Sequence, residues 1–139
     1  MSYTIEDYDF DQEVRAYDSY FATAQTLPVD DSADGDEGVK YAGETNDKIE
    51  CVVVVNTEVT IAEGDDLVLT FKGTTTLTGS SFVDLGSITI TGATGGSTLA
   101  VGTELFRYTI NTQDNPYVKL VITGETVTGK IDAFMVGKV

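Results

Sequence analysis

The fold class of this chain is decided by the stretch Lys48-Ile49-Glu50-Cys51-Val52-Val53-Val54-Val55. It begins with alternating polar and apolar residues and then becomes apolar at five successive positions. A run that is apolar on both faces and rich in β-branched residues is typical of a strand covered on both sides. We therefore expect a central β-strand here, with the rest of the domain arranged around it.

The chain on the C-terminal side of this run shows further short strands. Leu67, Leu69 and Phe71 alternate with more polar residues and predict one inward face. The apolar parity changes between Leu85 and Ile88, which predicts a β-bulge at Gly86-Ser87. Three more alternating runs follow, at 106–110, 118–122 and 131–135, and the link 123–126 predicts a hairpin with a type II′ turn. Short strands at this spacing predict an all-β sandwich or barrel.

The first 46 residues differ from the rest. They include six of the 13 aromatic residues within the first 21 positions, interleaved with acids, followed by the acidic stretch 30–38. A disordered tail is usually poor in aromatic residues. We therefore predict one globular domain in two parts, an N-terminal arm with an acidic loop at 1–46 and a β-sandwich at 47–139.

The charge is strongly unbalanced. Eight Lys and Arg residues face 23 Asp and Glu residues, and residues 1–66 alone hold 18 acids and three bases, so this half carries the whole net charge of −15. A negative field repels phosphate backbones and anionic lipids, so neither nucleic acid nor a membrane is an expected partner. The first seven residues have neither the basic region nor the apolar region of a leader, so no signal peptide is expected. We expect the protein to be made in a cytoplasm.

The residues available for chemistry are few. With no His and one Cys, the chain lacks the usual general base and metal ligand and has no intrachain disulfide. Cys51 lies in the apolar run and is interpreted as a buried core residue. We expect no catalytic residues, no cofactor and no metal.

Two motifs resemble known binding loops. Asp30, Ser32, Asp34 and Gly35 match the first half of a calcium-binding EF-hand loop, but Tyr41 stands where that loop needs Glu, so we favour a plain acidic loop. Residues 124–130 nearly match a phosphate-binding loop, but Ile131 replaces the required Ser or Thr and a strand follows instead of a helix.

The C-terminal third carries a resemblance to a known family. Residues 116–124 (PYVKLVITG) and 128–136 (TGKIDAFMV) resemble the closing hairpin of the small capsid cement, or decoration, proteins of tailed bacteriophages. In that family an aromatic-led strand is followed by a Gly turn and a Gly-Lys-hydrophobic-x-Ala strand. Here Pro116 stands where Arg is frequent, and the arm is unusually acidic. The remaining length is similar only in outline.

The resemblance implies a jelly-roll-like antiparallel β-sandwich with an N-terminal aromatic and acidic arm. It also implies a homotrimer on the capsid exterior of a virion, which stabilises the major capsid protein lattice by bridging coat subunits. The candidate subunit or capsid contacts are the aromatic residues of the arm and the apolar residues expected on outer strand faces: Tyr3, Tyr8, Phe10, Tyr17, Tyr20, Phe21, Leu105, Val121, Phe134 and Val136.

Two alternatives remain open. The first is a carbohydrate-binding or host-attachment module of a tail fibre or cell surface, which would show an exposed aromatic platform. The second is a glycan-cleaving enzyme, which requires a cleft with two carboxylates about 5–9.5 Å apart.

Overall fold

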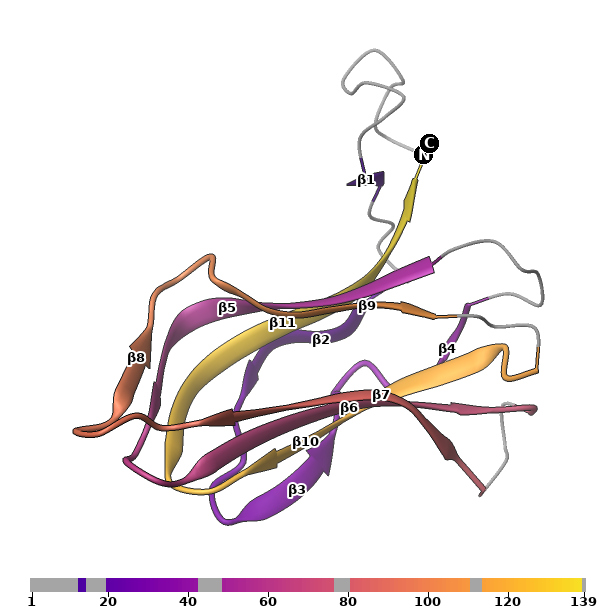
Figure 1. Cartoon of the computed structure of the whole chain (residues 1–139). Helices are drawn as coiled ribbons and strands as arrows, with labels where there is room; N and C mark the ends of the chain where they lie inside the picture. Colours follow the sequence, from indigo (N-terminus) through magenta and orange to yellow (C-terminus); the bar gives the residue numbers. More distant parts are fainter. Residues whose placement is uncertain (1–12, 15–19, 43–48, 77–80, 111–113, 139) are drawn as a thin grey trace.

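The computed structural model describes residues 13–14, 20–42, 49–76, 81–110 and 114–138. In this part of the chain every regular element is a β-strand, and the strands form two sheets that pack face to face (Figure 1). The predicted antiparallel β-sandwich is confirmed.

Each sheet collects strands from distant parts of the sequence. The first sheet contains β1 (Glu13–Val14), β2 (Tyr20–Thr26), β5 (Ile49–Ile61), β8 (Ser97–Leu99), β9 (Glu104–Ile110) and β11 (Val127–Lys138). The second sheet contains β3 (Asp31–Asp34), β4 (Lys40–Tyr41), β6 (Asp66–Thr74), β7 (Val83–Thr91) and β10 (Tyr117–Gly124).

Part of the strand pairing is nested along the sequence, and all pairs of strands are antiparallel. The early strand β2 pairs with the last strand β11, and β3 and β4 pair with the next-to-last strand β10. Moving inward along the sequence, β5 pairs with β8 and β9, and β6 pairs with its neighbour β7. The pairs of β5 with β11 and of β6 with β10 join these nested pairs side by side into the two sheets. Contacts between residues far apart in sequence therefore hold both sheets together.

The main core lies between the two sheets. Leu67, Leu69 and Phe71 of β6 are completely buried in it, as their alternation predicts. The strand β5 lies between β11 and β9, which confirms the prediction of a central strand. Its residues Cys51 and Val53 face the core between the sheets.

The run at 51–55 is apolar on both faces because β5 is covered on both sides. Val52 points to the opposite face from Cys51 and Val53, where it is buried with Phe134 and Val136 in a second, smaller cluster. Tyr20 packs against this outer cluster. The first sheet therefore has apolar residues on its outer as well as its inner face.

The predicted bulge in β7 is confirmed, one residue earlier than expected. Phe71 pairs with Gly86 and Lys72 with Asp84, so Leu85 is the extra residue. Leu85 thereby packs on the core, as do Ile88 and Ile90.

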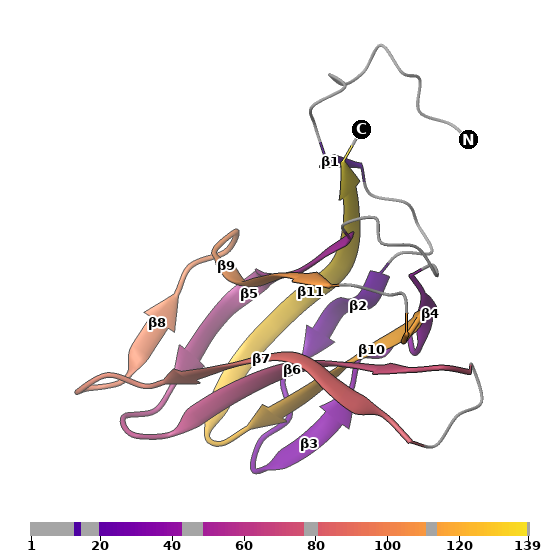
Figure 2. The same ribbon diagram turned by 45° about the vertical axis from the view of Figure 1, so that its right-hand side comes forward.

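The last strand, β11, bends across the sandwich between two irregular neighbours (Figure 2). The pairing of β11 with β2 shifts register twice between Ile131 and Phe134, and its pairing with β5 shifts twice between Thr128 and Ile131. Such bulges bend a strand and increase its twist. Beyond Val136, β11 pairs with β1 through Gly137 and Lys138.

The predicted hairpin at 123–126 is wrong. The strands β10 and β11 belong to different sheets, so this link crosses from one layer to the other. Thr126 has the positive φ, 40°, whereas Gly124 ends β10. The backbone N–H of Glu125 donates to the backbone carbonyl of Asp66, and the backbone carbonyl of Thr126 accepts from the N–H of Ala62. These bonds attach the link to the neighbouring connection between β5 and β6, which also passes from one sheet to the other.

The predicted boundary at residues 46 and 47 also needs correction. The strands β2, β3 and β4 all precede it, yet they form part of the two sheets. Phe21, Ala22 and Leu27 are buried in the main core. The sandwich therefore starts by Tyr20, because the nested pairing needs these early strands beside β10 and β11.

Candidate interaction surfaces and a surface pocket

The aromatic residues predicted for the arm have different positions. Tyr3, Tyr8, Phe10 and Tyr17 lie outside the described residues. Tyr20 is half-buried on the outer face of the first sheet, with its ring 5.3 Å from that of Phe134. Phe21 faces the core instead, 5.4 Å from the ring of Phe71, and is fully buried. Phe21 is therefore a packing residue, because the bulged β2 turns it inward.

The apolar residues expected on outer faces are mostly buried within the protein itself. Leu105 is the unpaired residue of a bulge in β9, between the pairs Val54 with Glu104 and Val53 with Phe106. The bulge turns Leu105 into the main core, so its predicted outward position is wrong. Phe134 and Val136 do point away from the main core, but they are 1% and 0% exposed. Val121 is half-buried on β10.

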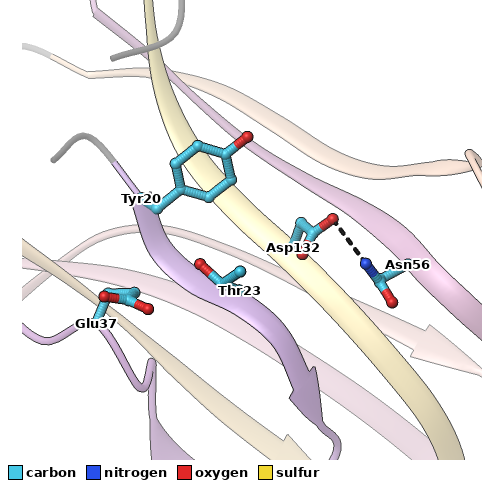
Figure 3. A pocket seen from close by; sticks show the side chains of 5 residues that line it. All are labelled: Tyr20, Thr23, Glu37, Asn56 and Asp132. Atoms are coloured by element: carbon cyan, nitrogen blue, oxygen red, sulfur yellow. Dashed lines mark hydrogen bonds between the residues drawn. The ribbon is translucent and has the colours of Figure 1, made fainter. Parts of the chain in front are cut away.

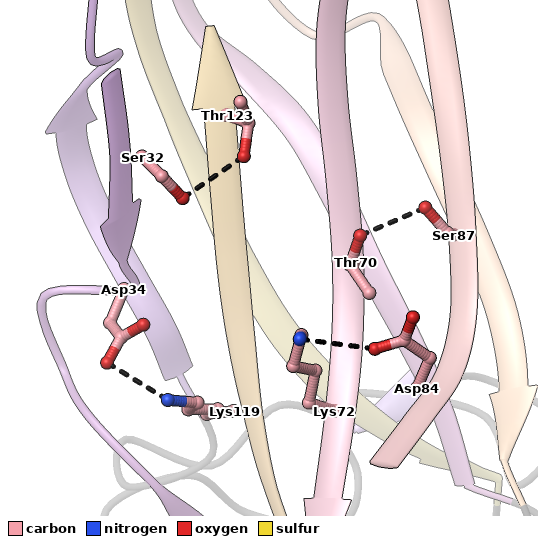
Figure 4. Close-up of polar contacts among 8 residues, drawn as sticks. All are labelled: Ser32, Asp34, Thr70, Lys72, Asp84, Ser87, Lys119 and Thr123. Atoms are coloured by element: carbon pink, nitrogen blue, oxygen red, sulfur yellow. Dashed lines mark hydrogen bonds and ion pairs between the residues drawn. The ribbon is translucent and has the colours of Figure 1, made fainter. Parts of the chain in front are cut away.

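The outer face of the second sheet is polar. Across neighbouring strands, the hydroxyls of Ser32 and Thr123 lie 3.1 Å apart, and those of Thr70 and Ser87 lie 2.9 Å apart. Two ion pairs continue this pattern, Lys72 with Asp84 and Lys119 with Asp34, each at 3.2 Å (Figure 4). This face has the composition of a hydrated sheet surface.

Arg107 of β9 and Lys119 of β10 both form ion pairs. Arg107 contacts Glu50 at 3.0 Å and Glu104 at 2.8 Å. Lys119, besides its contact with Asp34, lies 4.3 Å from the centre of the Phe82 ring, within the range of a cation–π interaction. These contacts are those expected of charges at the rim of a β-sandwich.

A pocket of about 290 Å³ opens on the outer face of the first sheet (Figure 3). It is lined by Tyr20 and Thr23 of β2, Glu37 of the turn after β3, Asn56 of β5 and Asp132 of β11. Sequence patterns gave little sign of this pocket, because its residues come from four separate segments. The one signal is Asp132, a polar residue that shares the outer face of β11 with Phe134 and Val136.

Asp132 binds both irregular strands beside it. Its Oδ1 accepts a hydrogen bond of 2.7 Å from the backbone N–H of Ala24, and its Oδ2 accepts one of 3.1 Å from the Asn56 side chain. Ala24 has a positive φ of 44° in the bulged part of β2, and Asn56 is the extra residue of a bulge in β5. One carboxylate thus fixes two bulges and one wall of the pocket.

The pocket bears on the enzyme alternative. Glu37 and Asp132 both line it, as that alternative requires of two carboxylates. Both oxygens of Asp132, however, already accept hydrogen bonds that hold β2 and β5 in place. The arrangement gives Asp132 a structural role.

The other sites weighed from the sequence have simple structural explanations. Cys51 is fully buried, as predicted, and burial raises the pKa of its thiol well above the ordinary value of 9.0. Residues 31–34 of the acidic stretch form a strand, and no group of three His, Cys, Asp or Glu residues in the described ranges could hold a metal ion. Lys130 and Ile131 lie within the strand β11, which confirms the prediction that a strand, and not the helix of a phosphate-binding loop, follows residues 124–130.

Within the described part of the chain, no helix is long and apolar enough to cross a membrane. Neither a protein-family model nor a curated protein matches the chain.

Proposed function

We propose that this protein is a structural component of a virion that binds the outside of an assembled phage capsid and stabilises it by bridging coat subunits. The observation that carries the proposal is the nested pairing of early strands with late ones, in which β2 pairs with the last strand β11 and β3 pairs with the next-to-last strand β10. This order supports a jelly roll, an architecture that recurs in viral capsid domains and in lectins. The strand sequences at 116–124 and 128–136 add the resemblance to capsid cement proteins.

The position of β1 supports a role for the N-terminal segment. β1 pairs with the last residues of β11, beyond the point where β11 leaves β5, and the pair rises away from the sandwich (Figure 1). Residues 1–12, with Tyr3, Tyr8 and Phe10, directly precede β1 in the sequence. An arm attached at this place would contact coat or a neighbouring copy without disturbing the sandwich.

The proposed mechanism is binding without catalysis or cofactor. A protein that binds across coat subunits, but not to free ones, stabilises the assembled shell by mass action. The proposed trimer multiplies the contacts of each copy, so individually weak contacts add to a strong attachment.

The decisive experiment mixes the purified protein with its coat lattice, stripped of decoration, and images the particles by electron microscopy. We expect added density at local threefold positions and a higher temperature of capsid disruption. A variant that lacks residues 1–12 should bind more weakly while keeping a folded sandwich. Absence of added density anywhere on the lattice would contradict the proposal.

A further inference from the structure

The pocket on the outer face of the first sheet is a built concavity. Its wall on the β2 side is fixed by the turn after β3, where the backbone N–H of Glu37 donates to the carbonyl of Phe21 at 2.9 Å. The carboxylate of Asp36 accepts from the backbone N–H of Thr23 at 3.1 Å, which ties the same turn to the same strand. The pocket therefore does not depend on an unsupported loop.

The opposite wall is equally fixed. Asp132 is bound to β2 through Ala24 and to β5 through Asn56, so the Asn56 amide is held at the pocket. The hydroxyl of Thr57 donates to the side-chain oxygen Oδ1 of Asn56 at 3.1 Å, which sets the orientation of the side-chain amide. Preorganised polar groups lose little conformational entropy on binding a ligand.

Several polar groups of the pocket remain available for a ligand. The Thr23 hydroxyl and the Glu37 carboxylate line the pocket and make no side-chain hydrogen bond or ion pair with the described residues. The Asn56 side-chain nitrogen has a second N–H besides the one given to Asp132. Together these groups offer a carboxylate acceptor, a hydroxyl that can donate or accept, and an amide donor. The half-buried ring of Tyr20 adds an apolar surface.

This set of groups fits one class of ligand. The hydroxyl groups of a sugar donate to carboxylates and accept from amides. The C–H groups on one face of the sugar ring pack on aromatic rings. Two carboxylates, Glu37 and Asp132, disfavour an anionic ligand. A volume of about 290 Å³ lies at the small end of ligand pockets and limits the occupant to about one sugar ring.

We propose that this pocket binds one unit of a neutral saccharide, with Glu37, Thr23 and Asn56 as hydrogen-bonding groups, Tyr20 as the apolar wall and Asp132 as a positioning residue. Such a site goes beyond capsid attachment, because it gives a decorated particle an affinity for neutral glycans on a surface. It lies on the outer face of the first sheet, and none of its residues belongs to the polar outer face of the second sheet.

The test is a titration of the ¹⁵N-labelled full chain, followed by the amide and side-chain spectra. The probes are glucose, galactose, mannose and N-acetylglucosamine, with N-acetylneuraminic acid and calcium chloride as charged comparisons. We expect saturable shifts at Thr23, Glu37, Asn56 and Asp132 with at least one neutral sugar, and a weak dissociation constant of about 1 mM. The charged probes should give no saturable response there.

Matched variants assign the effect to the pocket. Thr23→Val and Glu37→Gln should each weaken sugar binding about tenfold, because each removes one hydrogen-bonding group. Thr26→Val on the same strand and Glu58→Gln on β5, both exposed and outside the pocket lining, should leave the affinity unchanged.

Three results would overturn the proposal. They are the absence of saturable shifts with all four neutral sugars, the same shifts with calcium, and equal weakening by the control variants. Capsid binding of Glu37→Gln, measured by co-sedimentation with the coat lattice, separates this site from the function proposed above. Loss of sugar binding with unchanged capsid binding supports two independent sites.

Discussion

At Gly86, the missing side chain allows β7 to lie close to β9. A Cβ built there would lie 2.8 Å from three carbons of the Tyr108 ring, which is too close for any side chain. Tyr108 is half-buried and packs against the main core, so its ring has little room to move.

Gly86→Ala should therefore lower the free energy of unfolding by about 1–3 kcal/mol, the usual range for an overpacked contact. Urea denaturation measures the change. The control is Thr89→Ala on the same strand, where the side chain is exposed and a change within about 0.5 kcal/mol is expected. Equal stability of Gly86→Ala and the wild type would show that Tyr108 yields at little cost.

Cys51 provides a second prediction at the residue scale. Burial raises the pKa of its thiol above the ordinary value of 9.0, so the folded state holds the proton more tightly than the unfolded state does. This contribution to stability is fully present below about pH 9 and is lost as the pH rises further, because only the unfolded thiol ionises there.

The measurements are thiol labelling and denaturation at several pH values. Labelling of Cys51 should be negligible in the native protein and complete in urea. The loss of stability above about pH 9 should be smaller in Cys51→Ala than in the wild type. Fast labelling of the native protein would contradict the buried position.

Among the elements, β2 decides how much of the N-terminal segment can be deleted without loss of stability. Its residues Phe21 and Ala22 are buried in the main core, although they precede the run that the sequence marks as the start of the sandwich. Removal of residues 1–19 leaves β2 in place, whereas removal of residues 1–25 deletes most of it.

We expect the first truncation to unfold in one cooperative transition close to that of the full chain. The second should lose at least about 3–5 kcal/mol, the usual cost of removing one buried Phe side chain, or fail to fold. Thermal unfolding followed by circular dichroism distinguishes the two. A stable 1–25 deletion would show that β2 is dispensable.

Asp132 supports β11 at the point where both neighbouring strands are irregular. Asp132→Ala removes hydrogen bonds to Ala24 and Asn56, so we expect a loss of about 1–3 kcal/mol. Asp84→Ala is the control, since the pair of Asp84 with Lys72 is exposed and worth about 0–1 kcal/mol. Similar losses from the two variants, measured by urea denaturation, would contradict a special role for Asp132.

For the whole molecule, the net charge of −15 is the dominant property. The sequence alone attributed it to an arm and an acidic loop, but part of the acidic half forms strands of the sandwich, including Asp31 and Asp34 of β3. Two explanations for the charge remain, attraction to a basic patch on the coat and solubility in a salty environment.

If attraction explains the charge, capsid binding should weaken clearly between about 0.1 M and 1 M salt, where the Debye length falls from about 10 Å to about 3 Å. Co-sedimentation with the coat lattice at a series of salt concentrations measures this effect. The solution mass by light scattering should be three times the 14.9 kDa of one chain and should not change over the same range. Binding that is independent of salt would leave solubility as the explanation.

The sequence by itself determined the fold class, the existence of the central strand β5 (Ile49–Ile61), the inward face of β6 and, within one residue, the bulge in β7. Each of these follows from alternation along a single strand, because a strand with one buried face must place apolar residues at every second position. The same local reasoning identified Cys51 as a core residue.

Only the tertiary structure decided which strands belong to which sheet, where the sandwich begins and where the pocket lies. Phe21 and Leu105 are the extra residues of bulges in β2 and β9, so they point inward against the simple alternation. The link between β10 and β11 crosses between sheets, because β10 pairs with β6 in one sheet and β11 pairs with β5 in the other, and both partners are distant in sequence. Pairing between distant segments is a property of the packed molecule, and no local pattern encodes it.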